Sequence, residues 1–298
     1  MVQRESASTI KADGHDVKVT NLDKVLYPQS GFTKADVINY YVSIAPVLLP
    51  QLKDRPVTRI RFPDGVTAGK FFEKNAPRGT PSWVRTLTLK ASPGSEDEGK
   101  DVNYPFVDDV ATLIWLANLA VLEMHTPQWR SGPRGGVKKS DRLVIDLDPG
   151  EGTGLNECAE AAHIIAERLE KDDLTTYPVT SGSKGIQLYA PVANKSIGDT
   201  HTYARELARE LAAKHDKKIV SDMAKAKRRG KVLLDWSQNH VAKTTITPYA
   251  LRARDTIGVA APRTWEEIAP GLKQLGPEEV LHRLDDLGDI APPSGAKN

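Results

Sequence analysis

The sequence has little cysteine, no long apolar run and almost no excess of either charge. Its 298 residues contain one cysteine, Cys158. A single thiol forms no internal disulfide, so a secreted disulfide scaffold is excluded and a reducing cytoplasm fits. The longest apolar stretch, Val110 to Leu122, is shorter than the roughly 20 residues that span a bilayer. Met1 to Ala12 lacks the apolar core of a signal peptide. We therefore expect a cytoplasmic protein without membrane contact.

Charge is balanced over the whole chain but not along it. There are 41 lysines and arginines against 39 aspartates and glutamates, and 39% of residues are hydrophobic, as in globular proteins. From Lys217 to Lys231, however, seven residues are basic and one, Asp222, is acidic. Such a run is often only a solvated loop, but it also suits contact with a phosphate backbone. A nucleic-acid binder would have to gather its positive charge in local patches of this kind.

Helix and strand signals alternate without regular βαβ repeats, which favours an α+β (mixed α/β) fold. Thr33 to Asp36 is typical of a capped helix start, and apolar residues follow at helical spacing. The apolar segment from Val110 to Met124 predicts a buried helix, and Trp265 to Leu287 is expected to be mostly helical. Loops are expected at 92–100 and 131–140, and a frayed tail from Ala291. The other predicted elements are helices at 156–170 and 200–214 and strands at 17–20, 56–62, 70–72, 83–89, 142–148, 177–180, 185–190 and 231–235.

Aspartates stand at the ends of two apolar strands. Asp146 and Asp148 alternate on the first, so they share one face about 6.5 to 7 Å apart, and two carboxylates there can hold a divalent cation. On this local pattern alone, a metal site and a strand-to-turn junction with capping aspartates are both open. Asp235 ends the second strand, where a turn cap is the simpler interpretation. Three carboxylates on adjacent strands would form a cradle for two metal ions in nucleotidyl transfer.

Other segments carry weaker signals. Thr180 to Gly185 is a serine- and glycine-rich turn with a lysine, which suits phosphate binding or an ordinary hairpin, and it lacks the Walker A spacing. Phe71 and Phe72 follow basic residues and could stack on an unpaired base, although we expect at least one of them to be buried. His125 follows the predicted buried helix, where a structural role is the default.

Seven segments occur in an order that resembles one known family. They are VTNLDKVLYP, RIRFPDGV with FFEKNAP, LEMHTPQWR, RLVIDLDPGEG, PVTSGSKGIQLY, VLLDWSQN and YALRAR. Together they identify residues 17–284 as similar to the polymerase domain of bacterial ligase D, in the archaeo-eukaryotic primase superfamily. The resemblance implies a primase-polymerase fold, with central antiparallel or mixed sheets flanked by helices and an RRM-like catalytic module. It implies one domain over 1–298, with an N-terminal module to about 105 and a catalytic module from 106.

The resemblance also implies an activity. It predicts a template-dependent polymerase that adds ribonucleotides, and also deoxynucleotides, to primer 3′ ends at short gaps or double-strand breaks, using two divalent ions, with Mn²⁺ favoured over Mg²⁺. The expected partners are gapped or broken DNA with a 5′-phosphate, NTP and dNTP substrates, a DNA ligase and a Ku-type end-binding protein. We expect a nucleoid-associated monomer, either an excised domain or a stand-alone relative, because no ligase or nuclease domain is present.

The roles implied by the resemblance fall on fifteen residues. The predicted metal ligands are Asp146, Asp148 and Asp235. The predicted nucleotide-binding residues are His125, Ser181, Lys184, Gln238, Arg252 and, more weakly, Asn21. The predicted DNA contacts are Lys24 and Lys34 at a 5′-phosphate, Phe71 and Phe72 on the template, Arg228 at the primer terminus, and Arg61. The segment from Pro77 to Asn103 is expected to form a loop that reads the broken end.

One departure and two alternatives stay open. Several relatives have a lysine where Ile60 stands, so either Arg59 or Arg61 compensates or the triphosphate has fewer contacts. A non-catalytic DNA-end-binding or bridging module is the main alternative, which the three aspartates disfavour. A nucleotide-sugar transferase that uses Asp-x-Asp would leave the basic run and the phenylalanine pair without a role.

Overall fold

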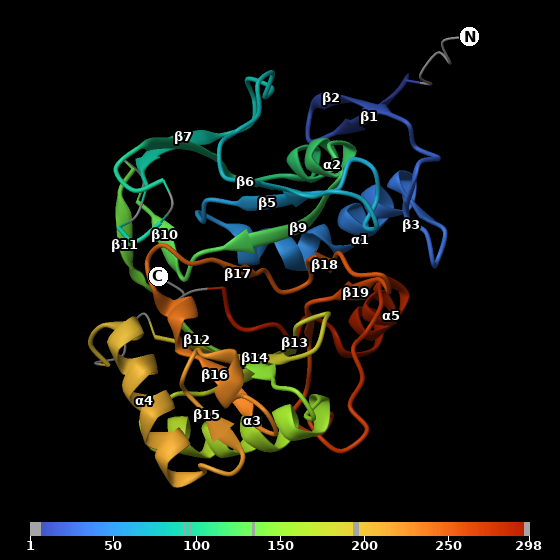
Figure 1. Cartoon of the computed structure of the whole chain (residues 1–298). Helices are drawn as coiled ribbons and strands as arrows, with labels where there is room; N and C mark the ends of the chain where they lie inside the picture. Colours follow the sequence, from blue (N-terminus) through green and yellow to red (C-terminus); the bar gives the residue numbers. More distant parts are fainter. Residues whose placement is uncertain (1–6, 92, 96, 133–134, 193–196, 295–298) are drawn as a thin grey trace.

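A computed structural model describes residues 7–91, 93–95, 97–132, 135–192 and 197–294. Its described part contains five α-helices and several antiparallel or mixed sheets, which confirms the α+β prediction. The structure has a four-stranded and a six-stranded sheet, which lie in the upper and lower halves of Figure 1 respectively. No helix in the described residues is long and apolar enough to cross a membrane.

The four-stranded sheet is antiparallel and packs against α1 (Lys34–Leu52) and α2 (Val110–Asn118). Its strands, in order across the sheet, are β17 (Thr245–Ile246), β9 (Val121–Thr126), β5 (Thr58–Arg61) and β6 (Phe71–Glu73). Helix α1 begins where the sequence predicts, because Thr33 and Asp36 form a reciprocal capping box. The sheet takes strands from both sides of residue 105, and the division into two modules there stays a prediction.

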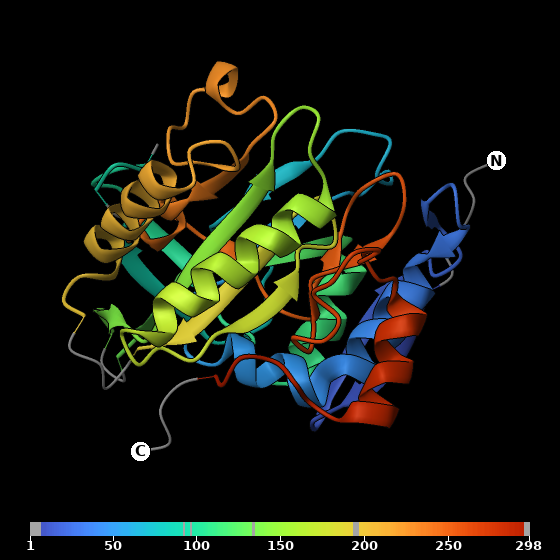
Figure 2. The same ribbon diagram turned by 90° about the horizontal axis from the view of Figure 1, so that it is seen from below.

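The six-stranded sheet is mixed, with one parallel pair at its edge. Its strands, in order, are β15 (Ile219–Val220), β16 (Val232–Asp235), β12 (Arg142–Pro149), β14 (Ile186–Pro191), β13 (Tyr177–Thr180) and β20 (Ala261–Pro262). Helices α3 (Leu155–Glu170) and α4 (Thr200–Lys214) cover one face of this sheet, as Figure 2 shows from below.

Strand β12 separates two hydrophobic cores. Its residues Leu143, Ile145 and Leu147 pack with α3 and α4, whereas Val144 packs into the core that includes α1 and α2. Successive side chains of a strand point to opposite faces, so Asp146 and Asp148 lie on the face of Val144. The face that carries the two aspartates is therefore the one that looks toward the four-stranded sheet, away from α3 and α4.

Small hairpins and short helices complete the described chain. They are β1 (Ala7–Ala12) with β2 (His15–Thr20), β3 (Val25–Tyr27) with β4 (Phe32–Thr33), β7 (Thr86–Lys90) with β8 (Asp101–Pro105), β10 (Trp129–Ser131) with β11 (Val137–Ser140), β18 (Leu251–Arg252) with β19 (Gly258–Val259), the 3-10 helices η1 (Lys225–Lys227) and η2 (Trp236–Asn239), and α5 (Pro277–Leu287). The predicted loop at 131–140 is thus largely a hairpin. Residues 92, 96, 133–134 and 295–298, within the predicted loops and tail, lie outside the described residues.

Two predicted helices are wrong in part. The segment 110–124 is not one helix, because α2 ends at Asn118 and the chain continues into β9. Ala120 makes the break with a positive φ of 58°, and its carbonyl accepts a hydrogen bond from Phe62 N at 2.9 Å. A continuous apolar run fits a buried helix and a buried strand equally well. In 265–287, only α5 is an α-helix.

Candidate active site

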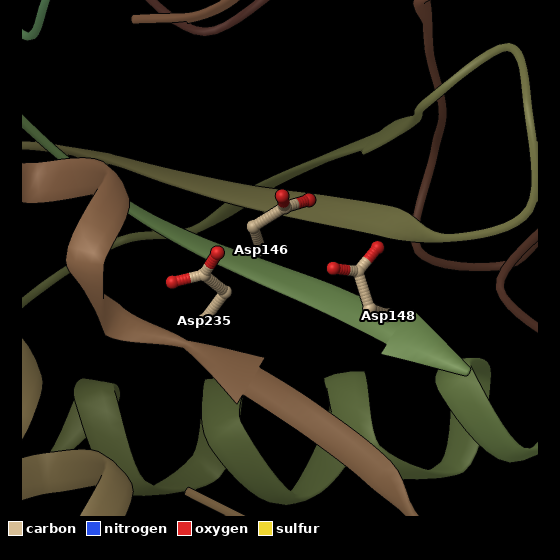
Figure 3. Close-up of side chains that lie close together, drawn as sticks. All are labelled: Asp146, Asp148 and Asp235. Atoms are coloured by element: carbon tan, nitrogen blue, oxygen red, sulfur yellow. The ribbon is translucent and has the colours of Figure 1, made fainter. Parts of the chain in front are cut away.

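Three aspartates on neighbouring strands meet in one cluster. Asp146 and Asp148 share a face of β12, and Asp235 on β16 is the direct antiparallel partner of Asp146. One carboxylate oxygen from each residue lies within 4.8 Å of the others (Figure 3). Like charges placed directly opposite in a sheet destabilise it, so this arrangement calls for a compensating cation. The structure brings the three predicted metal ligands together, and their role as ligands remains a proposal.

The electrostatics of the cluster fit a divalent metal site. Burial, followed by repulsion from Asp148 and Asp235, raises the pKa of Asp146 well above its usual value. Burial and Asp235 likewise raise the pKa of Asp148. Hard divalent cations prefer carboxylate oxygens, and a bound cation would remove this repulsion. The three residues could therefore hold a divalent ion of the Mg²⁺ or Mn²⁺ kind.

Helix η2 holds Asp235 in place. The Asp235 carboxylate accepts hydrogen bonds from Ser237 Oγ at 2.6 Å and from Gln238 Nε2 at 3.0 Å. Asn239 bonds both backbone groups of Val144 on β12, at 2.6 and 2.9 Å. The predicted nucleotide residue Gln238 thus lies directly beside the cluster, and β16 is fixed to β12 by side chains as well as by its ladder.

The serine- and glycine-rich turn joins β13 to β14 and is held by hydrogen bonds within the turn and with Gln274. Ser181 Oγ accepts from Gly185 N at 3.1 Å and can still donate its own hydrogen. Gln274 Oε1 accepts from Gly182 N at 2.7 Å, and its Nε2 donates to Gly185 O at 3.1 Å. Gly182 has a φ of +69°, and a Cβ there would lie 2.9 Å from Arg252 Cβ. Lys184 lines the adjoining cavity of about 860 Å³ together with Lys70 and Arg254.

His125 and Arg252 connect this region to the four-stranded sheet. His125 is on β9, and its Nε2 lies 2.8 Å from Glu123 Oε2. Arg252 Nη1 lies 3.4 Å from the same oxygen, and its positive charge lowers the pKa values of Asp146 and Asp148. Sequence reasoning missed Glu123 because β9 was taken for helix. In a strand, residues two apart share a face, so an acid two positions before His125 was the available signal.

Lys24 and Lys34, which are predicted to bind a 5′-phosphate, lie near each other and near Asn21. Lys24 Nζ forms an exposed ion pair with Asp64 at 2.8 Å. Lys34 is buried, and its Nζ donates to Thr20 O at 2.9 Å. Asn21 has a positive φ of 53°, and its carbonyl accepts from Lys24 N at 3.1 Å. Backbone contacts therefore join the three residues, but the Lys24 ammonium would have to leave Asp64 to bind a phosphate.

The aromatic pair stands on the edge strand of the four-stranded sheet. Phe71 and Phe72 are 54% and 59% exposed, so the expectation that one would be buried is wrong. Arg61, the cross-strand partner of Phe71, donates to Glu73 Oε1 at 2.9 Å and to Leu119 O at 2.8 Å. Arg59 is fully buried, lies 3.6 Å from Glu73 and donates to Asn75 O. Both arginines thus already have partners, and they stiffen the strand that presents the two rings.

Arg228 lies at the end of the basic run, directly against β12. A Cβ on Gly150 would lie 1.8 Å from Arg228 O, so only glycine permits this approach. Gly150 N donates to Lys231 O at 2.9 Å, and the Arg228 charge lowers the pKa of Asp148. The predicted primer-binding residue is therefore within electrostatic reach of the cluster.

Three carboxylates on adjacent strands, beside a lysine-bearing turn and an arginine, define a nucleotidyltransferase of the primase-polymerase class. A family model described as "LigD, primase-polymerase domain" matches residues 33–291. The chain belongs to this LigD primase-polymerase domain family.

Relatives and a solved structure are similar to most of the chain. The multifunctional non-homologous end joining protein LigD of Mycolicibacterium smegmatis is 46% identical over 94% of this chain. The LigD protein of Mycobacterium tuberculosis is 43% identical over 92% of the chain, and that of Bacillus subtilis is 32% identical over 86%. The chain spans 36% of the two mycobacterial proteins and 40% of the third. The polymerase domain from Mycobacterium tuberculosis ligase D in complex with DNA matches with a TM-score of 0.86 and 43% identity, over 92% of this chain and 96% of that one.

Proposed function

We propose that this chain is a template-dependent polymerase that adds ribonucleotides, and also deoxynucleotides, to primer 3′ ends at short gaps or double-strand breaks in DNA. The observation that carries the proposal is that Arg252 acts electrostatically on the aspartate cluster, and that Gly185, next to Lys184 in the turn, packs closely against Leu147 O on β12. Carboxylates that bind cations and basic groups that bind phosphates are thereby brought to one place, as transfer from a nucleoside triphosphate requires.

The proposed reaction is an in-line displacement at the α-phosphate of the nucleotide. The primer 3′ hydroxyl attacks, and pyrophosphate leaves. Asp146, Asp148 and Asp235 would hold two divalent ions, Mn²⁺ or Mg²⁺, which would offset charge on the attacking and leaving oxygens. Arg252, which pairs with Glu123, and Lys184, on the turn that leads into β14 beside β12, would stabilise the negative charge of the triphosphate. His125, Ser181, Gln238 and Asn21 are the further proposed nucleotide contacts.

The DNA surface is proposed to run over Lys24, Lys34, Arg61, Phe71, Phe72 and Arg228. The two exposed rings offer stacking faces for template bases, and this favours their proposed role. Arg61 acts by holding β6, since its guanidinium is already bonded to Glu73. The segment 77–103, which includes β7 and β8, is proposed to read the broken end.

The proposed biological setting is end joining or gap repair in the bacterial nucleoid. It rests on the relatives, which are named for non-homologous end joining, and on the solved neighbour, which is a complex with DNA. A ligase and a Ku-type end-binding protein are the proposed partners, and the chain is proposed to act as a monomer.

The test is extension of a primer across a gap of one to three nucleotides, with ATP compared with dATP in Mn²⁺ and in Mg²⁺. We expect template-directed addition of both nucleotides, faster with ATP and with Mn²⁺. Binding of the gapped DNA without any extension would replace the proposal by the alternative of a non-catalytic end-binding module. Extension by dATP alone would overturn the ribonucleotide preference and leave the polymerase assignment standing.

The first DNA prediction concerns the downstream 5′-phosphate. Removing this phosphate should weaken binding to gapped DNA, and the difference should disappear in Lys24→Ala. Lys214→Ala is the matched control, because Lys214 is also an exposed lysine paired with a carboxylate, Glu210 at 2.6 Å, but it lies on α4. Fluorescence anisotropy with the two DNA forms measures the effect. Equal affinity for both forms in the unaltered protein would remove Lys24 and Lys34 from the site.

The second DNA prediction concerns the aromatic pair. Replacing Phe71 and Phe72 by alanine should weaken binding to gapped DNA by about fivefold or more, because base stacking contributes about 1–3 kcal/mol per base. Nucleotide binding should change much less. Leu287→Ala removes a comparably exposed apolar side chain from α5 and serves as the control. An equal loss of nucleotide and DNA binding would contradict a role in template stacking.

A further inference from the structure

Glu123 is a buried carboxylate that faces three basic side chains. It lies on β9 with its side chain 3% exposed, and its Oε2 is 2.8 Å from His125 Nε2 and 3.4 Å from Arg252 Nη1. Its Oε1 accepts from Ala253 N at 3.0 Å and lies 3.8 Å from Arg254 Nη1. One carboxylate therefore contacts His125 on its own strand and the segment 252–254 next to it.

Tyrosines from the first core fix these two segments to each other. The Tyr41 hydroxyl donates to Leu122 O at 2.7 Å and accepts from Leu251 N at 3.2 Å. The Tyr27 hydroxyl donates to Arg252 O at 3.3 Å. Backbone atoms on either side of Glu123 and Arg252 are thus held by side chains from α1 and β3. The contacts of Glu123 are part of a fixed framework.

The bond to Glu123 decides which nitrogen of His125 is left for a ligand. His125 and Arg252 hold the pKa of Glu123 below its usual value despite burial, so the group is an ionised carboxylate that can only accept. His125 Nε2 must therefore carry the proton of this hydrogen bond, and Nδ1 remains for the ligand. A neutral ring offers Nδ1 only as an acceptor, whereas phosphate oxygens require a donor. His125 can bind a triphosphate only when both of its nitrogens are protonated.

We propose that Glu123 is the positioning residue of the nucleotide site, which holds His125 and Arg252 toward the triphosphate and stabilises the protonated form of His125 once the nucleotide is bound. This inference rests on the proposed nucleotide-binding role of these two residues. It predicts that nucleotide binding is accompanied by uptake of a proton. It also predicts that removing the charge of Glu123 weakens nucleotide binding most strongly where His125 would otherwise become protonated.

The charges around His125 agree with this proton uptake. Burial lowers the pKa of His125, Glu123 raises it, and Arg252 and Arg254 lower it. Burial keeps the hydroxyl pKa values of Tyr27 and Tyr41 well above their usual range, so both remain neutral. A bound triphosphate would offset the two guanidinium groups and add negative charge. Among the described residues, nothing accepts a hydrogen bond from the buried Nε of Arg252, which leaves that donor for a ligand.

The decisive measurement is calorimetric titration of ATP into the protein with Mn²⁺, in buffers of different ionisation enthalpy, which counts the protons taken up. Near pH 7 we expect uptake of a proton by the unaltered protein and a smaller uptake by Glu123→Gln, which keeps the shape and loses the charge. The Kd for ATP should rise by about tenfold for each unit by which the pKa of His125 falls. In primer extension at saturating Mn²⁺, KM for ATP should rise with pH in both proteins, with the curve of the variant displaced to lower pH and kcat changed far less.

Two comparisons separate this role from a general loss of structure. Glu267→Gln is the matched control, since Glu267 also accepts a backbone N–H, at 2.8 Å from Thr264, and pairs two arginines, Arg263 and Arg283. Its proton uptake and pH curve should match the unaltered protein. In a His125→Gln background, Glu123→Gln should produce no further displacement.

The outcomes distinguish the inference from the function on which it rests. ATP binding without proton uptake, or equal uptake and equal pH curves for the unaltered protein and Glu123→Gln, would overturn the role of Glu123 and leave the polymerase intact. Absence of any nucleotide binding by the unaltered protein would instead overturn the proposed function.

Discussion

Two groups of carboxylates lie on facing parts of this molecule and have opposite surroundings. Glu123 is surrounded by His125, Arg252 and Arg254, and its pKa is lowered by His125 and Arg252. Asp146 and Asp148 face each other and Asp235, and burial with this repulsion raises their pKa values. The protein supplies enough positive charge to keep the pKa of Glu123 low, but not enough to do the same for Asp146 and Asp148. The difference fits the proposed roles, in which Glu123 positions basic side chains and the three aspartates hold a cation.

Arg252 connects the two groups. It pairs with Glu123 at 3.4 Å, and its charge also reaches Asp146 and Asp148. Arg252 and Arg228 do not offset the burial and repulsion at Asp146 and Asp148, whose pKa values stay raised in spite of them. Under the proposed function, divalent ions would supply the missing charge and Arg252 would face the triphosphate.

The largest expected effect is the loss of primer extension when an aspartate of the cluster is replaced. Asp146→Asn should lower primer extension by about 100- to 1000-fold or more, because it removes a charge that would hold the metal ions. Glu151→Gln is a suitable control, since Glu151 follows the same strand but is exposed and pairs only with Arg229. Single-turnover extension in Mn²⁺ measures the effect. Undiminished extension by Asp146→Asn would break the assignment of the cluster as the metal site.

The next effect is the pH dependence of metal binding. Raised carboxyl pKa values mean that protons compete with the metal above the usual range of aspartate. The Mn²⁺ affinity should therefore fall as pH is lowered from about 7.5 toward 5.5, by about tenfold per pH unit for each proton displaced. Titration of Mn²⁺ followed by electron paramagnetic resonance at several pH values provides the test. An affinity that stays constant across this range would show that the cluster is fully ionised without metal.

The aspartate cluster was predictable from sequence and the Glu123 cluster was not, for a physical reason. The period of two on a strand places Asp146 and Asp148 on one face, and an apolar strand that ends in Asp235 suggested the third member. The run from Val110 to Met124 is apolar apart from Thr112, Asn118 and Glu123, which suits a buried helix or strand. The chain passes from α2 to β9 at Ala120, which has a left-handed backbone conformation. This conformation usually signals itself by a glycine in the sequence, and here there is none.

The exposure and the partners of the surface residues could not be predicted from the sequence either. The exposure of both Phe71 and Phe72 depends on β6 being an edge strand, which follows from the order of strands across the sheet. That order joins segments far apart in sequence, so local patterns do not contain it. The partners of Lys24 and Arg61, which are Asp64 and Glu73, are likewise set by tertiary packing.

The smallest expected effect is on stability, and its sign should differ between the two groups. The folded-state pKa of Asp146 is raised, so its ionisation costs stability progressively as pH rises from its unfolded pKa to its folded pKa, and Asp146→Asn removes this cost. The folded-state pKa of Glu123 is lowered, so its stabilisation is present above its unfolded pKa and is lost in Glu123→Gln. In metal-free buffer at pH 7.5, thermal unfolding should shift up by about 2–4 °C for Asp146→Asn and down by a similar amount for Glu123→Gln. Shifts in the same direction would mean that packing, rather than countercharge, decides the energy of both groups. Adding Mn²⁺ should then raise the Tm of the unaltered protein more than that of Asp146→Asn, because only the intact cluster gains a full set of ligands on binding.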